Sequence, residues 1–242
     1  MGSGDSVTQM WSDGLGSLNF QHVLGDYYPA SWGIVQFVLA ANSPQAAVSL
    51  YYLFYNSIWT TMLLGSEWSS YAQKNKFLRV SSPQGQQRQT YRLQIPYAYS
   101  ITLLAAMILL HWLISESIFL ANTSYHYRGE QIQPAGAEAY GRYPEFTVGI
   151  SGIGVFFATI LAGLMLIALF INGFRHYSPN MPLTGGCSAV ISAACHPPPD
   201  DTDAALSAIG WGVIESGSSS GFGHCCFTTY NTEAPVAGEL YS

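Results

Sequence analysis

Residues 97–121 constrain this chain most, because they form a run long and apolar enough to cross a lipid bilayer as one helix. About 20 apolar residues, at roughly 1.5 Å each, span the hydrocarbon layer. The run contains two ionisable residues, His111 and Glu116. Ionisable groups are costly inside a membrane and often mark functional positions. The run therefore predicts a membrane protein and makes these two residues the first functional candidates.

The composition of the chain agrees with this prediction. Only 9% of the 242 residues are charged, whereas about a quarter are charged in soluble domains. The net charge is −6, and the basic residues do not form a stripe interleaved with aromatic residues. Nucleic acid is therefore excluded as a partner, and the lipid bilayer is the expected one.

Two further runs, residues 46–65 and 147–174, pass the same length test. An apolar stretch at 32–41 precedes the first of them, and a polar interruption that contains Pro44 separates the two. Proline lacks a backbone donor and predicts a kink. The stretch at 32–41 is then either the first turns of one long bent helix or a helix at the membrane interface. The predicted fold is a mainly α membrane protein with three transmembrane helices in residues 32–174, the first kinked at Pro44.

The charges of the two intervening loops predict an orientation. Loop 66–96 has five basic residues and one acidic residue, a net of 5 − 1 = +4: Lys74, Lys76, Arg79, Arg88 and Arg92 against Glu67. Loop 122–146 has two basic and three acidic residues, a net of 2 − 3 = −1. The positive-inside rule places the first loop in the cytosol and the second outside, where the Asn122-Thr-Ser sequence could accept a glycan. Three crossings then leave residues 1–31 outside and the acidic tail, 175–242, in the cytosol.

The tail contains two candidate strands. Residues 208–214 and 224–230 have strand-like composition, and a Gly/Ser-rich turn lies between them. They predict a small sheet of two or three strands. Such a sheet is marginal alone, so we expect it to pack on the cytosolic ends of the helices.

Polar residues inside the predicted spans allow two interpretations. His111 and Ser115 project from one helix face, and Glu116 points away from it. A histidine with a nearby hydroxyl and carboxylate could relay protons or contact a ligand. Alternatively, His111 is structural and bonds to a neighbouring helix, where Asn56 and Asn172 are available, while Glu116 lies near the outer interface.

Small residues recur at every fourth position of the third span, at Gly154, Ala158 and Ala162. This spacing lets two helix backbones approach closely in lipid. We expect this stripe to pack against the other two helices.

The sequence gives no signature of an enzyme or of a metal site. Cys195-His196 and His224-Cys225 supply ligand types that zinc prefers, but the spacing of a structural zinc site is missing. The chain also lacks a Gly-x-Ser-x-Gly elbow, a phosphate-binding loop and a His-Glu-x-x-His motif. No metal, other cofactor or enzymatic activity is therefore expected.

Several segments together resemble one family: residues 79–88 (Arg-Val-Ser-Ser-Pro-Gln-Gly-Gln-Gln-Arg), 110–115 (Leu-His-Trp-Leu-Ile-Ser), 188–197, 210–213 and 223–225. The chain is similar through them, from about Trp11 onward, to a family of uncharacterised fungal multi-pass membrane proteins. Members are typically longer, with additional helices before this region, so the chain resembles their C-terminal portion. The resemblance implies a membrane protein of fungal origin and transfers no catalytic residue.

The expected function is that of a structural or accessory membrane subunit in the endomembrane system or plasma membrane. Its partners would be other membrane proteins or the upstream helices of the longer family architecture. The alternative is a transporter or channel component in which polar residues around His111 line a path. A third possibility is a membrane-embedded enzyme that uses His111 or Cys195-His196.

Overall fold

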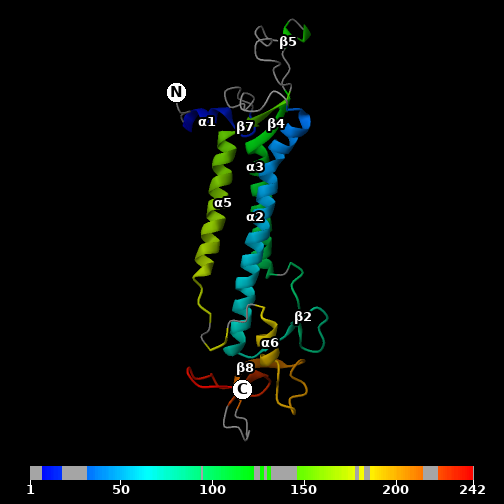
Figure 1. Cartoon of the computed structure of the whole chain (residues 1–242), viewed down its shortest axis with the longest axis vertical. Coiled ribbons are helices and arrows are strands. Elements are labelled where there is room, and N and C mark those ends of the chain that lie inside the picture. The colour runs from blue at the N-terminus through cyan, green and yellow to red at the C-terminus, as the bar shows by residue number, and fades with distance from the viewer. Residues whose placement is uncertain are drawn as a thin grey trace. The chain divides into compact units, whose positions relative to one another are not determined.

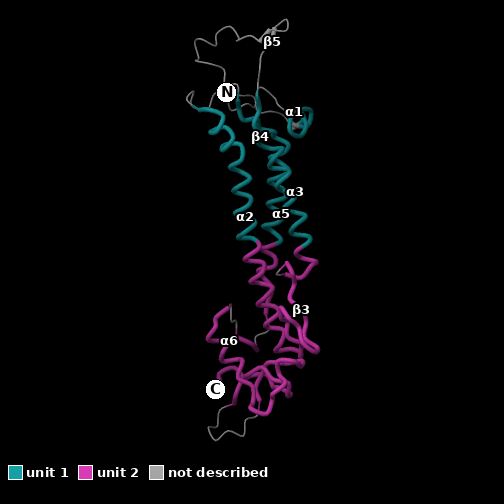
Figure 2. Tube along the Cα trace, turned by 90° about the vertical axis from the view of Figure 1, so that its right-hand side faces the viewer, with its two compact units in different colours: residues 1–55, 101–168 teal, residues 56–100, 169–242 magenta. Residues whose placement is uncertain are grey.

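The computed structural model describes residues 7–17, 32–93, 95–122, 126–127, 130–131, 146–177, 180–182, 186–214 and 223–241. The chain divides into two compact units, which are coloured separately in Figure 2. Unit 1 contains residues 1–55 and 101–168, and unit 2 contains residues 56–100 and 169–242.

The longest element is α2, Ile34–Ser69, which continues through Pro44 as a single helix (Figure 1). Proline at position 44 cannot donate to the carbonyl of Ala40, four residues earlier. The hydroxyl of Ser43 donates to that carbonyl instead, at 2.8 Å. This substitute hydrogen bond satisfies the orphaned acceptor. Residues 34–41 are therefore the first turns of one long helix, which is the first of the two alternatives that the sequence allowed.

Among the residues that the structure describes, two helices are long and apolar enough to cross a membrane, judged by length and composition: α3, Tyr97–Ser117, and α5, Gly152–Gly173. Helix α2 is longer but less apolar, because Tyr51, Tyr52 and Asn56 lie within it. In unit 1, stretches of these three helices run beside one another, drawn in teal in Figure 2.

Both apolar helices are shorter than the sequence predicted, because their ends are replaced by strands. β4, Ile118–Asn122, pairs antiparallel with β7, Phe146–Ile150. The predicted spans at 97–121 and 147–174 had assigned these residues to helix. An apolar run that is continuous with a helix cannot be distinguished from a buried strand by its periodicity. The predicted loop 122–146 accordingly begins and ends in a sheet.

The β4–β7 pair packs on the first turns of α2. Val148 of β7 is 1% exposed and forms a buried cluster with Phe37 and Ala41 of α2. Helix α1, Val7–Asp13, belongs to the same unit, and its Trp11 meets Phe157 of α5 edge to face. Unit 1 also contains a short antiparallel pair of strands: β5, His126–Tyr127, and β6, Glu130–Gln131.

Unit 2 is built around a small antiparallel sheet in the order β1-β8-β9. Its strands are β1, Lys76–Phe77, β8, Ala208–Ile214, and β9, His224–Thr228. β8 has the range that the sequence predicted, and β9 ends two residues earlier than predicted. β1 was not foreseen, because its segment carried only the signals of a loop. A parallel pair, β2 (Arg79–Val80) and β3 (Arg88–Gln89), the 3₁₀ turn η3 (Ser70–Ala72) and helix α6 (Ser188–Ala194) surround the sheet.

Aromatic side chains form the core of unit 2. Phe227 of β9 meets Trp68 and Tyr71 edge to face, with ring centroids 4.9 and 5.6 Å apart. Trp211 of β8 is buried in the same cluster. The sheet is thereby fixed to the end of α2 and to η3, so the tail and loop 66–96 form one packed unit.

Candidate functional site

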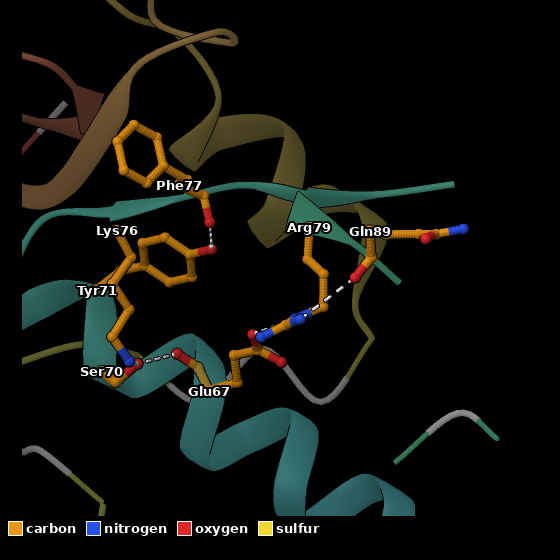
Figure 3. Close-up of polar contacts among 7 residues, drawn as sticks. All are labelled: Glu67, Ser70, Tyr71, Lys76, Phe77, Arg79 and Gln89. Atoms are coloured by element: carbon orange, nitrogen blue, oxygen red, sulfur yellow. Dashed lines mark hydrogen bonds and ion pairs between the residues drawn. The ribbon is translucent and has the colours of Figure 1, made fainter. Parts of the chain in front are cut away.

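A cluster of charged and polar side chains lies where α2 ends and β1 and β2 begin (Figure 3). Glu67 of α2 accepts a hydrogen bond from Nε of Arg79, at 3.0 Å. The same guanidinium donates to the carbonyl of Gln89 at 3.3 Å and lies 4.1 Å from the centre of the Tyr91 ring. Arg79 is therefore held by an anion, a backbone acceptor and an aromatic face at once.

Lys76 lies in the same cluster and has a different environment. Its ammonium donates to the hydroxyl of Ser70 at 2.5 Å, and that hydroxyl donates to the carbonyl of Glu67. Burial lowers the pKa of Lys76, and the neighbouring charge of Lys74 lowers it further, while Glu67 opposes the shift. The cluster ties β2 to the end of α2 through an ion pair and β1 to η3 through a hydrogen bond. It contains no arrangement of nucleophile and base.

A second polar site lies at the end of β9, around the buried carboxylate of Asp201. One oxygen accepts from the hydroxyl of Thr228 at 2.6 Å and from the N–H of Thr229 at 2.8 Å, and the other accepts from the Thr229 hydroxyl at 2.8 Å. Burial alone would raise the pKa of Asp201, but these three hydrogen bonds outweigh it and hold the pKa below its usual value. Asp201 therefore acts as an ionised anchor for the end of β9.

The residues predicted inside the membrane do not form a catalytic group. His111 is half-buried and, within the described part of the chain, has no hydrogen-bond partner. Ser115 is exposed and Glu116 is half-buried. Asn56 is half-buried, and the amide of Asn172 lies 3.1 Å from the sulfur of Met62 and accepts from Arg175 at 3.4 Å. The hydrogen bond expected for His111 is thus missing among these residues.

Two tyrosines that the sequence analysis did not single out supply interhelical hydrogen bonds in unit 1. Tyr51 Oη donates to the carbonyl of Ala162 at 3.4 Å, and Tyr55 Oη donates to that of Met165 at 3.1 Å. The spacing of four residues between the tyrosines places them on one face of α2. This four-residue spacing is the feature of the sequence from which a shared role of the two tyrosines could have been predicted.

The small-residue stripe of α5 lies against neighbouring helices. Gly154 packs on the end of α3: a Cβ there would lie 3.0 and 3.1 Å from the Cα and N of Ser117. Ala158 is 4% exposed, and the carbonyl of Ala162 accepts the Tyr51 hydroxyl. Within unit 1, Gly154 thus adjoins α3 and the backbone of Ala162 adjoins α2.

The cysteine and histidine residues of the tail do not form a metal site in the part of the chain that the structure describes. His224 Nε2 lies 2.8 Å from the carbonyl of His196, so that nitrogen is already engaged. Cys195 is exposed and Cys225 half-buried. Cys226 is fully buried, and burial raises the pKa of its thiol to about 11. It is a packing residue rather than a nucleophile at neutral pH.

Asn122, the predicted glycan acceptor, is exposed and is the last residue of β4. The two residues that complete its sequon lie outside the described residues.

The chain belongs to the family described as Domain of unknown function (DUF8419), whose model matches residues 1–233. No curated protein and no solved structure matches the chain.

Proposed function

We propose that the chain is an integral membrane protein in which α2, α3 and α5 span the bilayer, and that it serves as a structural or accessory subunit of a membrane assembly. A fungal origin and a multi-pass architecture belong to the same proposal, through the family resemblance of the sequence. Residues 1–31 would lie outside, and the basic loop 66–96 and the tail 175–242 would lie in the cytosol.

The observation that carries the proposal is the exposure of the most apolar helices. Only 28% of the apolar window in α3 and 22% of that in α5 is buried. A core helix of a soluble protein would bury most of such a surface. The large exposed side chains of α5 are apolar throughout: Val155, Phe156, Ile160, Leu164, Leu166, Ile167, Phe170 and Ile171. Lipid tails or the apolar faces of other membrane helices are the surroundings that such a surface suits.

The hydroxyl groups of the helices support the same proposal. Ser49, Thr61 and Thr159 each donate to a backbone carbonyl four residues earlier, at 2.8–3.0 Å. A hydroxyl that is satisfied within its own helix needs neither water nor a polar neighbour. These side chains can therefore face lipid without an unpaired donor.

The contacts that the polar side chains make favour a structural or accessory role over catalysis. Arg79 and Asp201 are engaged in holding strands in place, and the described residues of the helices contain no nucleophile with a base beside it. The transporter alternative draws support from one observation: His111 is half-buried and unbonded within the described part of the chain, so it is chemically available.

Two measurements on microsomes test the proposal. Extraction with alkaline carbonate should leave the chain in the membrane pellet. A membrane-impermeant maleimide should label the exposed Cys187 and Cys195 in sealed microsomes without detergent, because their cytosolic face points outward. The variant with Cys187→Ser and Cys195→Ser should lose this labelling, since the two remaining cysteines are half-buried or buried. Release by carbonate would refute the membrane assignment. Labelling that requires detergent would reverse the orientation.

A further inference from the structure

The basic segment, residues 74–92, gathers positive charge around a single carboxylate. The charges of Lys74, Arg79, Arg88 and Glu67 all act on the ammonium of Lys76, so each of these four groups lies within electrostatic range of Lys76. Four cations around one carboxylate leave a net charge of +3. Such a concentration of one sign attracts an oppositely charged partner.

Glu67 cannot neutralise all four cations, because its carboxylate is already paired with Arg79. The Arg79 Nε–Glu67 Oε1 pair is 3.0 Å long, and Arg79 is also held by Gln89 and Tyr91. Glu67 therefore does not neutralise the charges of the other cations. Lys74, Arg88 and Arg92 are exposed and form no ion pair within the described residues.

The register of the short β2–β3 pair also brings two of these positive charges together. It places Arg88 directly opposite Arg79, and the ladder is continued by Arg88 N–H donating to the carbonyl of Leu78 at 2.8 Å. Like charges opposite each other destabilise a strand pair. Within the described part of the chain, Arg79 is paired with a carboxylate and Arg88 is not. An external anion at Arg88 would relieve the remaining repulsion.

Aromatic and apolar residues adjoin these cations at the start of α3. The rings of Tyr91 and Tyr97 pack edge to face, 5.7 Å apart, and Tyr97 is the first residue of the helix. Leu93 and Tyr97 are 47% and 48% exposed. Aromatic residues beside basic ones at the end of an apolar helix are typical of the headgroup level of a membrane. The anion expected at this position is therefore a lipid headgroup.

We propose that Lys74, Arg88 and Arg92 bind the headgroups of anionic phospholipids where α3 enters the membrane, with Leu93 and Tyr97 seated at the interface. The proposal rests on the membrane assignment made above and adds a ligand class to it. The three cations meet the headgroup phosphates and carboxylates, while Arg79 and Glu67 hold the two short strands that present Arg88.

The test uses the full chain in dodecyl maltoside micelles, titrated with dioctanoyl phosphatidylserine. Dioctanoyl phosphatidylcholine and inorganic phosphate are titrated in parallel. Phosphatidylserine should bind, and the other two should bind at least tenfold more weakly. The variant with Arg88→Gln and Arg92→Gln should lose roughly 30-fold in affinity, the order expected for two charges near an anionic surface. Raising the salt concentration should weaken binding by the wild type.

The matched control removes the same number of charges elsewhere in the sequence, through Arg128→Gln and Arg142→Gln, and should bind like the wild type. If the arginine variant of the basic segment does not fold, Ser81→Asp with Ser82→Asp adds two negative charges to the exposed turn between β2 and β3 and should also weaken binding. Unchanged affinity in the folded variant would overturn the proposal, and so would inorganic phosphate binding as tightly as phosphatidylserine. Carbonate extraction of the same variants separates this failure from failure of the membrane assignment.

Discussion

The two units of the chain differ in how ionised side chains contribute to them, although hydroxyls donate to backbone carbonyls in both. In unit 1, hydroxyls such as those of Tyr55 and Thr159 donate to backbone carbonyls of the helices. In unit 2, ionised carboxylates organise the structure, Glu67 by pairing with Arg79 and Asp201 by accepting three hydrogen bonds. Neutral hydrogen bonds within and between helices suit a surface without water, whereas paired and hydrogen-bonded ions suit one with water nearby. This difference is what the proposed membrane assignment predicts for a chain with one part in lipid and another part in water.

The largest expected effect comes from the anchor of unit 2. Asp201→Ala leaves two hydroxyls and one backbone N–H without their acceptor, and it should lower the free energy of unfolding by about 2–4 kcal/mol, because buried donors are left unsatisfied. Thermal unfolding in detergent, followed by tryptophan fluorescence, measures the loss. Asp203→Ala, an exposed neighbour, is the control and should change little. Equal effects of the two substitutions would show that the buried carboxylate has no special role.

The same carboxylate predicts a pH dependence. Its pKa is lower in the folded state than the ordinary value of 3.8, so its contribution to stability is present above that value and is lost as the pH falls through the lower, folded pKa. Acid unfolding of the wild type should therefore include a step below pH 3.8 that is missing in Asp201→Asn. Identical acid profiles of the two proteins would contradict the assignment.

In unit 1, the larger expected loss of stability comes from a steric clash and not from a lost hydrogen bond. Gly154→Ala would place a Cβ 3.0 Å from the backbone of Ser117, whereas at Gly163, on the same helix, a Cβ would meet nothing within 4 Å. We expect Gly154→Ala to cost about 1–3 kcal/mol through overpacking, and Gly163→Ala to be neutral or to stabilise by about 0.5–1 kcal/mol through its helix preference. Midpoints of thermal unfolding in detergent compare the two. If both glycines tolerate alanine, the helices do not meet closely at Gly154.

A smaller loss should follow removal of an interhelical hydrogen bond. Tyr55→Phe deletes the bond to the Met165 carbonyl and keeps the ring, so we expect a cost of about 0.6 kcal/mol, the average measured for such bonds in lipid. Tyr52→Phe changes a tyrosine of the same helix for which the described residues offer no hydrogen-bond partner, and it should be neutral. The difference between the two variants, rather than either value alone, tests the bond.

The smallest effect on stability is expected at His111. Because no described residue bonds to its side chain, His111→Gln should change the free energy of unfolding by less than about 0.5 kcal/mol, the usual range for a residue without such contacts. Protein level and localisation in cells, together with growth of a strain that depends on the protein, are the measurements. A loss of function in well-folded His111→Gln protein would favour the transporter alternative over the accessory role.

The sequence predicted elements whose signals are local and missed those that depend on distant partners. β8 was found from its own composition, and the core of α3 from its own length. β1 was missed because two residues form a strand only when β8 lies beside them. Asp201 was missed for a related reason: it stands between Asp200 and Asp203 in an acidic stretch, and only the position of Thr228 and Thr229 distinguishes the buried carboxylate from the exposed ones.

The pairing of β1 with β8 also sets an order of events during synthesis. β1 leaves the ribosome about 130 residues before its partner strand, and at about 5–20 residues per second this interval lasts roughly 6–26 s. During that time Lys76 and Phe77 have no sheet to join, while α3 and α5 are being made. The aromatic core around Phe227 can close only afterwards. Completion of the sheet is therefore a late step of folding. A chain whose synthesis stops before β8 cannot complete it.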